Sequence, residues 1–133
     1  MSQINVAVAV VVGGNNQVLI AKRKEGGPQG GLWEFPGGKI ETGETSGQAL
    51  FRELEEELTI AVLEASFFIK IEHKYPELDV MLDVWVVSKF TGRAKGNEGQ
   101  LIAWVPVDQL KLYEFPEANI PIIDALQSNL VNQ

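Results

Sequence analysis

The hydrophobic and polar positions divide the chain into short apolar segments separated by turn-forming residues. Ile4 to Val12 is a continuous apolar run rich in valine, which predicts a buried strand. The glycines and asparagines at 13–16 predict a turn, and Gln17 to Arg23 is expected to form the returning strand. The chain therefore begins with a pair of strands.

Further apolar segments of strand length follow in the second half of the chain. We expect strands at 65–74 and 78–87, joined around Pro76, and another at 102–105. The polar stretch from Thr91 to Gly99 separates the last two of these and predicts a loop. The strands are thus grouped on either side of a long central segment with a different periodicity.

A glycine-rich region precedes that central segment. Lys24 to Gly31 contains four glycines, a proline and no aliphatic residue, which predicts a mobile loop that either connects two elements or covers a site. Leu32 to Phe35 is apolar again and leads into Pro36-Gly37-Gly38-Lys39. A P-loop is excluded, because no glycine stands five residues before Gly38 and Ile40 occupies the position that requires serine or threonine.

Two main helices are predicted. Thr45 followed by Gln48 matches a capping box, so the first helix is expected to begin at Thr45 or Ser46. The helical period places four apolar side chains in one arc of roughly 100°, the stripe expected to face the core: Leu50, Phe51, Leu54 and Leu58. Pro121 is expected to open a C-terminal helix. Residues Val107 to Leu112 are expected to form a short helix. The apolar side of the C-terminal helix carries Ile122, Ile123, Leu126 and Leu130.

These elements predict an α/β fold with helices on either face of a mixed sheet. The chain of 133 residues suits one modest core, and it contains no repeat, linker or low-complexity tract. We therefore expect a single domain over residues 1–133.

The first predicted helix carries a concentration of acidic residues. Glu53, Glu56 and Glu57 fall together in an arc of roughly 100° beside the apolar stripe, whereas Glu55 and Arg52 are expected on the far side. Neighbouring like charges repel by a few tenths of a kcal/mol per pair, so a cation is expected among them. Carboxylates at this spacing suit Mg²⁺ or Mn²⁺, which take few protein ligands. The alternative is a solvated acidic face paired with lysines.

Composition narrows the class of function. The formal net charge of -7 argues against non-specific binding to nucleic acid, and an acidic protein that handles a polyphosphate needs cations between the two. The absence of cysteine excludes disulfides, zinc-thiolate sites and cysteine nucleophiles. The apolar run Ile4 to Val12 is too short to span a bilayer and lacks a basic leader or cleavage site, so we expect a cytoplasmic protein.

The residues around the glutamates resemble the signature of the Nudix hydrolases. That signature is a glycine, five residues, a glutamate, seven residues, and then Arg-Glu-aliphatic-x-Glu-Glu-x-Gly-aliphatic. The matching positions here are Gly38, Glu44, Arg52, Glu53, Leu54, Glu56, Glu57 and Ile60. The one departure is Thr59, where the family usually has a glycine that ends the helix in a left-handed turn. The resemblance implies the Nudix fold, an α/β/α sandwich with a mixed β-sheet between helices, and hydrolysis of a nucleoside diphosphate linked to another group.

The resemblance also implies which groups hold the metal. Glu53 is the candidate for the general base or for the ligand of the attacking water. Glu56 and Glu57 are implied as direct ligands, together with the carbonyl of Gly37, where the lack of a side chain lets the backbone approach an ion. Divalent ions there would neutralise phosphate charge and lower the pKa of a bound water, whose proton a carboxylate then takes.

Other residues are implied in supporting roles. Arg52 is similar to the family arginine that orients a neighbouring glutamate, and Glu44 is expected to support the turn or the surroundings of the ligands. Glu98, in the polar loop, is alternatively a plain loop acid or, by resemblance, a second base or metal ligand. His73, the only histidine, is expected to be a surface or satisfied residue rather than a catalyst.

Three segments extend the resemblance to the MutT branch, whose members remove 8-oxo-dGTP from the nucleotide pool. They are Leu32 to Glu41, Glu98-Gly99-Gln100 before Trp104, and Phe115 to Pro121. Within them Phe35 is implied to pack on the base, and the substrate-binding set is Arg23, Phe35, Lys39 and Asn119. In one respect the chain differs, because the turn before the second long strand reads Glu77-Leu78, without the basic residue of MutT-like chains.

Asn119 is the residue that bears on substrate choice. Its structural alternative is a cap for the helix opening at Pro121. Its functional role follows from the amide, which offers a donor and an acceptor side by side. Oxidised guanine presents an O6 acceptor beside a protonated N7, whereas ordinary guanine has a lone pair at N7. A polar site that loses its partner in this way discriminates strongly.

Three functions remain open at this point. The first is a Mg²⁺-dependent hydrolase, with Mn²⁺ as a possible substitute, that converts oxidised purine nucleoside triphosphates such as 8-oxo-dGTP to the monophosphate and pyrophosphate. The second is a Nudix enzyme for CTP or modified pyrimidine nucleotides, against which Asn119 argues. The third is a non-enzymatic binding module, a class that typically loses the glutamates present here. The expected partner is a nucleoside triphosphate rather than a nucleic acid polymer or a membrane, and either a monomer or a dimer is compatible with the sequence.

Overall fold

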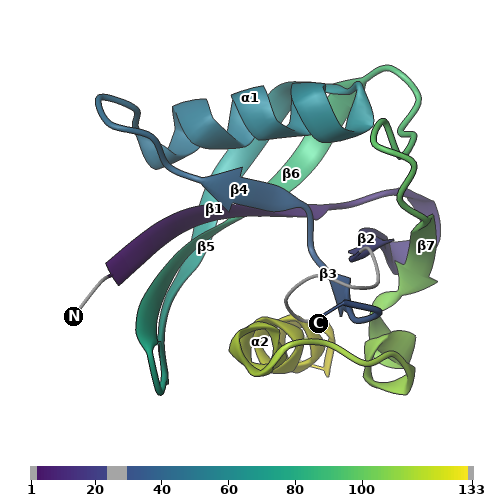
Figure 1. Ribbon diagram of the computed structural model, residues 1–133. Coiled ribbons are helices and arrows are strands. Elements are labelled where there is room, and N and C mark those ends of the chain that lie inside the picture. Colours follow the sequence, from purple (N-terminus) through teal and green to yellow (C-terminus); the bar gives the residue numbers. More distant parts are fainter. Residues whose placement is uncertain (1–2, 24–29, 132–133) are drawn as a thin grey trace.

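The computed structural model describes residues 3–23 and 30–131, and shows two sheets and two helices (Figure 1). A four-stranded sheet has the order β4-β1-β6-β5, and a three-stranded sheet has the order β3-β2-β7. The strands are β1 (Gln3–Val11), β2 (Gln17–Lys22), β3 (Trp33–Glu34), β4 (Gly37–Lys39), β5 (Ala61–Tyr75), β6 (Leu78–Thr91) and β7 (Ile102–Pro106). The helices are α1 (Ser46–Leu58) and α2 (Ile120–Val131), with 3₁₀ turns η1 (Gly14–Asn16), η2 (Val107–Leu112) and η3 (Glu117–Asn119).

Strand β1 lies at the centre of the molecule and is buried on both faces. It pairs in parallel with β6, from Gln3 opposite Asp79 to Val11 opposite Val87, and antiparallel with β4. Its residues alternate between two cores, with Val8 and Val10 in one and Ala7, Ala9 and Val11 in the other. Burial on both faces at 7–11 explains why this part of the strand is apolar without alternation, whereas the polar residues Gln3 and Asn5 lie in its exposed first half.

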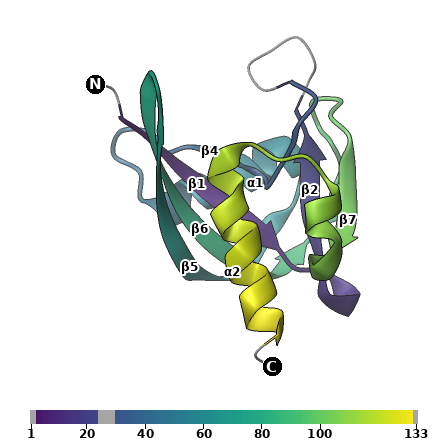
Figure 2. The same cartoon turned by 90° about the horizontal axis from the view of Figure 1, so that it is seen from below.

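The two helices lie on opposite sides of the four-stranded sheet, as Figures 1 and 2 show. Helix α1 packs with the core that contains Ala7 and Ala9, whereas Ile122 and Ile123 of α2 belong to the other core. The predicted α/β sandwich with a mixed sheet between helices is therefore confirmed. No described helix is both long enough and apolar enough to cross a membrane.

Both ends of α1 are defined by side-chain or backbone geometry. The capping box is confirmed, since the Thr45 hydroxyl accepts from the Gln48 N–H and the Gln48 side chain accepts from the Thr45 N–H. At the other end Thr59 adopts φ 61° and ψ 35°, the left-handed conformation that the family usually assigns to glycine. Its N–H bonds to the carbonyl of Glu55, so threonine makes the same stop, at a conformational cost of about 1–2 kcal/mol.

The predicted rotation of α1 about its axis was partly wrong. Leu50, Leu54 and Leu58 are buried as expected, but Phe51 is 45% exposed and Ala49 is fully buried. The buried face is therefore rotated toward the acidic side of the helix. This rotation is the reason that some of the glutamates lie inside the interface between α1 and β4 instead of along its border.

Other boundaries differ from the sequence predictions by a few residues. Strands β5 and β6 extend beyond the predicted ranges 65–74 and 78–87. The apolar pattern did not reveal the full length of β5 because much of this outer strand is exposed and has no clear apolar period. The short helix at 107–112 is a 3₁₀ turn, and α2 begins at Ile120, one residue before Pro121. The predicted loop at 24–31 lies mostly outside the described residues, as does the Leu130 side chain.

Candidate active site

Two adjacent glycines on β4 bring the backbone against the acidic face of α1. A Cβ on Gly38 would collide with the Glu53 carboxylate. Gly37 has φ +153°, and a Cβ there would collide with the carbonyl oxygen of Ala7 on β1. Gly37 must therefore be glycine, whereas a side chain at Gly38 would displace the Glu53 carboxylate. The glycine pair and the acidic helix therefore form one structural unit.

Arg52 connects the acidic residues on that unit. Its Nε and Nη2 donate to the two carboxylate oxygens of Glu44 at 2.7 and 3.0 Å, and Nη1 donates to Glu53 Oε1 at 2.7 Å. Nη2 also donates to the carbonyl of Lys39 at 3.1 Å, and Glu56 Oε2 lies 3.5 Å from Nη1. The expectation that Arg52 points away from the glutamates is wrong, because its long side chain reaches back across the helix surface. Its implied contact with a neighbouring glutamate is confirmed.

Glu44 has the environment of a supporting residue. The Arg52 guanidinium and the backbone N–H of Glu41 hold the pKa of the Glu44 carboxyl at about 2. Glu44 and Glu53 in turn raise the pKa of the Arg52 guanidinium. Both groups therefore remain charged at neutral pH. Arg52 donates to Oε1 of Glu53, and Oε2 of that carboxylate is not used by Arg52.

Glu57 has the most perturbed carboxyl group. Burial raises its pKa to about 8, and the negative charges of Glu53, Glu34 and Glu98 add to the effect, whereas a hydrogen bond from the Gly37 N–H opposes it. These four carboxylates are near enough to interact, and Glu57 lies beside Gly37 as the family resemblance implies. In the absence of a cation, these surroundings disfavour the carboxylate form of Glu57.

The loop before β7 places Glu98 near this cluster by capping the end of α1. The N–H of Lys95 donates to the carbonyl of Leu58 at 3.1 Å, and the N–H of Asn97 donates to the carbonyl of Glu57 at 2.9 Å. The Asn97 amide also donates to the carbonyl of Glu56 at 2.9 Å. The backbone of Glu98 is held by Gln100, whose side-chain oxygen accepts from it at 2.8 Å. The polar loop is thus fixed to the helix that carries the glutamates.

The donor groups of the cluster suit a hard divalent cation, since they are carboxylates and a backbone carbonyl. Among the described residues, however, no three carboxylate or imidazole groups already stand close enough together to hold an ion. Glu53 is tied to Arg52, and the Glu56 side chain is 62% exposed. An ion would therefore be held by few protein ligands after small side-chain rotations, with substrate phosphates at its remaining positions.

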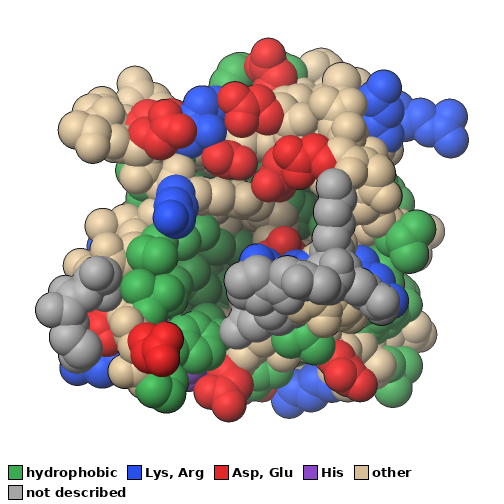
Figure 3. Space-filling model, viewed as in Figure 1, with side chains coloured by type: hydrophobic (Ala, Val, Ile, Leu, Met, Phe, Trp, Pro, Cys, Tyr) green, Lys and Arg blue, Asp and Glu red, His purple; other side chains and the backbone are tan. Residues whose placement is uncertain are grey.

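A cavity of about 550 Å³ lies beside the acidic cluster. Figure 3 shows an apolar hollow below a group of acidic side chains. Its walls come from β1, from the β5–β6 hairpin and from the segment before α2, and are formed largely by Ile4, Val6, Val8, Leu78, Val80 and Leu82. A cavity of this size, mostly apolar with few polar groups, is typical of a small-molecule site.

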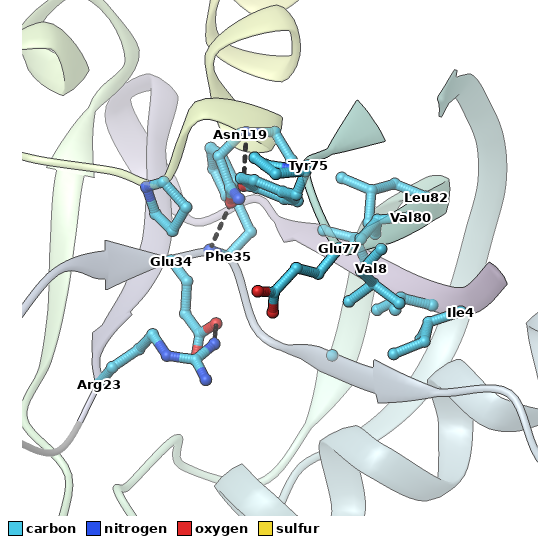
Figure 4. Close-up of a pocket in the computed structure, with 16 residues that line it drawn as sticks. Ile4, Val8, Arg23, Glu34, Phe35, Tyr75, Glu77, Val80, Leu82 and Asn119 are labelled. Atoms are coloured by element: carbon cyan, nitrogen blue, oxygen red, sulfur yellow. Dashed lines mark hydrogen bonds and ion pairs between the residues drawn. The ribbon is translucent and has the colours of Figure 1, made fainter. Parts of the chain in front are cut away.

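Asn119 and Phe35 form one wall of the cavity (Figure 4). Phe35 is only 4% exposed, and its ring stacks on Phe115 with centroids 5.4 Å apart. The Phe35 N–H donates to Asn119 Oδ1 at 3.5 Å. Because an N–H can only donate, this contact fixes the orientation of the amide and leaves its NH₂ group for another partner. The Asn119 side chain is therefore directed to the Phe35 backbone and the cavity, and not to the start of the helix at Pro121.

Arg23 and Glu34 form an ion pair at one end of the cavity (Figure 4). Arg23 Nη1 lies 2.8 Å from Glu34 Oε1. Burial raises the pKa of the Glu34 carboxyl, and the charge of Arg23 opposes that rise. Sequence reasoning missed Glu34, although it lies within the segment 32–41 that carries the family resemblance. Lys39, by contrast, is exposed and does not line the cavity.

The chain has clear relatives among known proteins. A family model described as the NUDIX domain matches residues 7–125. The chain belongs to the NUDIX domain family. A relative from Escherichia coli K12 named 8-oxo-dGTP diphosphatase is 38% identical over 127 residues, covering 96% of this chain and 98% of the relative. A CTP pyrophosphohydrolase from the same organism is 33% identical over 121 residues, covering 91% and 90%.

The solved structures agree with this assignment. One, from a study of MutT from Aliivibrio salmonicida and Vibrio cholerae, superimposes with a TM-score of 0.83 at 36% identity, covering 96% of this chain and 99% of the other. This Nudix protein is therefore a hydrolase, and its relatives act on nucleotides. Nudix hydrolases generally use divalent metal ions, which suits the charge and donor groups of the α1 cluster.

Replacing Glu55 with glutamine is expected to change kcat/KM by less than about twofold. The side chain of Glu55 is exposed on the face of α1 away from β4, so the substitution removes a charge without touching the cluster. Steady-state kinetics with a nucleotide substrate measures the effect. A loss of tenfold or more would show that the assigned acidic face of α1 is incorrect.

Proposed function

We propose that this Nudix hydrolase is a Mg²⁺-dependent pyrophosphohydrolase of oxidised purine nucleoside triphosphates, with 8-oxo-dGTP as its substrate. Mn²⁺ is expected to substitute for Mg²⁺, because both favour oxygen ligands. The observation that carries the proposal is Asn119, whose amide is oriented by the Phe35 N–H in the wall of an apolar cavity beside the acidic helix. The similarity of the chain to relatives named 8-oxo-dGTP diphosphatase supports the same substrate.

The amide of Asn119 matches the edge that oxidation changes. Its NH₂ group donates to O6 of the base, and its Oδ1 accepts from the protonated N7 of 8-oxoguanine while keeping a lone pair for the Phe35 N–H. With ordinary guanine, Oδ1 would face the N7 lone pair instead. An unpaired polar contact is costly where the base is packed against an apolar wall, so the cavity selects the oxidised base. The apolar wall formed by Phe35 and its neighbours supplies packing area for the base.

The acidic helix supplies the groups for hydrolysis. Glu53, Glu56, Glu57 and the Gly37 carbonyl are the proposed ligands, and a bound divalent ion would neutralise phosphate charge and lower the pKa of water. Oε2 of Glu53 takes the proton of the attacking water, with Glu98 as the alternative base. Water then divides the triphosphate into a nucleoside monophosphate and pyrophosphate.

Arg52 and Arg23 have different proposed tasks. Arg52, held by Glu44, fixes the Glu53 carboxylate through Oε1 and keeps it from rotating away. Arg23 lines the cavity beside Glu34, where its charge suits a phosphate or a polar edge of the base. Lys39 is exposed at the end of β4, next to the glycine pair, and is proposed to contact the outer phosphates.

The proposed setting is the cytoplasmic nucleotide pool, where removal of 8-oxo-dGTP prevents its incorporation into DNA. We propose that residues 1–133 act as a single Nudix domain on a free nucleotide, without a nucleic acid polymer or a membrane as partner. The net charge of -7 supports this, since it disfavours polyanions that arrive without cations.

A second candidate substrate is CTP, because one relative is named CTP pyrophosphohydrolase. Release of pyrophosphate from 8-oxo-dGTP, dGTP and CTP, each with and without EDTA, separates the possibilities. We expect kcat/KM to be at least ~100-fold higher for 8-oxo-dGTP than for dGTP or CTP, and EDTA to abolish turnover. Preferred turnover of CTP would establish the alternative, and no pyrophosphate from any nucleotide would indicate a binding module.

A further inference from the structure

Two side chains of β5 meet the short turn that carries Asn119, and one of them is hydrogen-bonded to it. The hydroxyl of Tyr75 accepts from the backbone N–H of Ala118 at 3.2 Å. His73 Nε2 lies 3.4 Å from Glu117 Oε2. The two side chains thus meet the two residues that precede Asn119, but only the contact of Tyr75 is a hydrogen bond. Figure 4 shows Tyr75 beside Asn119 at the same side of the cavity.

Tyr75 and His73 form a single support on one face of β5. They are two residues apart on the strand and so point to the same face, and their rings meet edge-on with centroids 4.4 Å apart. Tyr75 also lines the cavity, whereas the hydroxyl is used by the turn. The ring and the hydroxyl of this residue therefore have separable roles.

The turn itself is short. It is three residues long, and its backbone bonds join the Asn119 N–H to the Pro116 carbonyl at 3.0 Å and the Ile120 N–H to the Glu117 carbonyl. The side-chain bond of Asn119 to the Phe35 N–H is long, at 3.5 Å. Ala118 is 4% exposed, so its N–H depends on the Tyr75 hydroxyl for a partner. The Tyr75 hydroxyl therefore helps to set the position of the Asn119 backbone from β5.

We infer that Tyr75 is a positioning residue for base selection, acting through Ala118 on the direction of the Asn119 amide. This inference rests on the proposed recognition of oxidised guanine by Asn119. Hydrogen bonds weaken steeply when donor and acceptor are misaligned, and the two bonds of one amide to one base edge require both to be aligned together. Removing the hydroxyl leaves a buried N–H without a partner, and the turn shifts to recover one.

The test is the substitution Tyr75→Phe, which keeps the ring in the cavity and removes only the hydroxyl. We expect the ratio of kcat/KM for 8-oxo-dGTP to that for dGTP to fall about tenfold, mainly through the oxidised substrate. A purely structural role for Tyr75 would lower both rates equally and leave the ratio unchanged. Tyr113→Phe is the matched control, because Tyr113 packs on Trp33 outside the cavity and its ratio is expected to stay at the wild-type value.

Combining Tyr75→Phe with Asn119→Ala separates the positioning role of Tyr75 from base recognition by Asn119. In the Asn119→Ala background, Tyr75→Phe is expected to cause no further fall in the ratio, because the residue on which it acts is gone. An equal fall in both backgrounds, or a wild-type ratio for Tyr75→Phe beside a reduced ratio for Asn119→Ala, would overturn the positioning role alone. A wild-type ratio for Asn119→Ala itself would overturn the proposed base recognition and this inference with it.

Discussion

Replacing Glu57 with glutamine is expected to lower kcat/KM by at least ~1,000-fold while leaving the protein folded, a loss of about 4 kcal/mol of transition-state stabilisation. Glu57 is buried beside Gly37 and feels the charges of Glu53, Glu34 and Glu98. Glutamine keeps the size of the side chain but removes the charge that attracts a cation. Steady-state kinetics at saturating Mg²⁺ measures the loss, and Glu55→Gln is the matched control on the same helix.

The same substitution is expected to raise the stability of the metal-free protein although it lowers its activity. The pKa of Glu57 is raised from 4.5 to about 8, so the folded state disfavours its carboxylate. This destabilisation is absent below pH 4.5 and grows as the pH rises to about 8. Without metal at pH 8.5, thermal unfolding of Glu57→Gln is therefore expected at a higher midpoint than that of the wild type. Near-normal activity, or a lower midpoint, would contradict the position assigned to Glu57.

Replacing Asn119 with alanine is expected to reduce the preference for 8-oxo-dGTP over dGTP by roughly 100-fold. The amide is the polar group in the cavity wall that matches both O6 and a protonated N7, and alanine offers neither partner. The loss is expected mainly in the oxidised substrate, because ordinary guanine gains little from the amide. The ratio of kcat/KM for the two nucleotides measures it.

The matched control for that substitution is Asn129→Ala. Asn129 is exposed near the end of α2, away from the cavity, and its replacement is expected to leave the ratio unchanged. An unchanged ratio in Asn119→Ala would assign base selection to other groups, of which the Arg23–Glu34 pair is the nearest candidate in the cavity.

Much of the acidic site was predictable because its residues are close together in the sequence. The capping box at Thr45 fixed the start of α1, and the family spacing assigned Gly37, Glu53 and Glu57 to one place. The rotation of the helix was less accurate, since Ala49 and Phe51 differ in burial for reasons that depend on the sheet beneath them. The helical period alone could not determine which edge of the apolar stripe the sheet covers.

The cavity could not be predicted in the same way. Its walls combine β1, the β5–β6 hairpin and the turn at 116–119, which are far apart in the sequence and meet only in the fold. The bond of the Tyr75 hydroxyl to the turn depends on that meeting, and the Arg23–Glu34 pair depends on the pairing of β2 with β3. A local pattern carries no information on such contacts, so they were found only in the structure.

The central claim is that the acidic face of α1 and the glycine pair on β4 hold divalent cations. Titration of the protein with Mn²⁺, followed through its backbone amide NMR resonances, tests this directly, because the paramagnetic ion broadens the signals nearest to it. We predict that broadening begins at Gly37, Gly38 and Glu53 to Glu57, that Mg²⁺ reverses it, and that Glu57→Gln reduces it. Broadening that begins elsewhere, or that is the same in Glu57→Gln, would contradict the account.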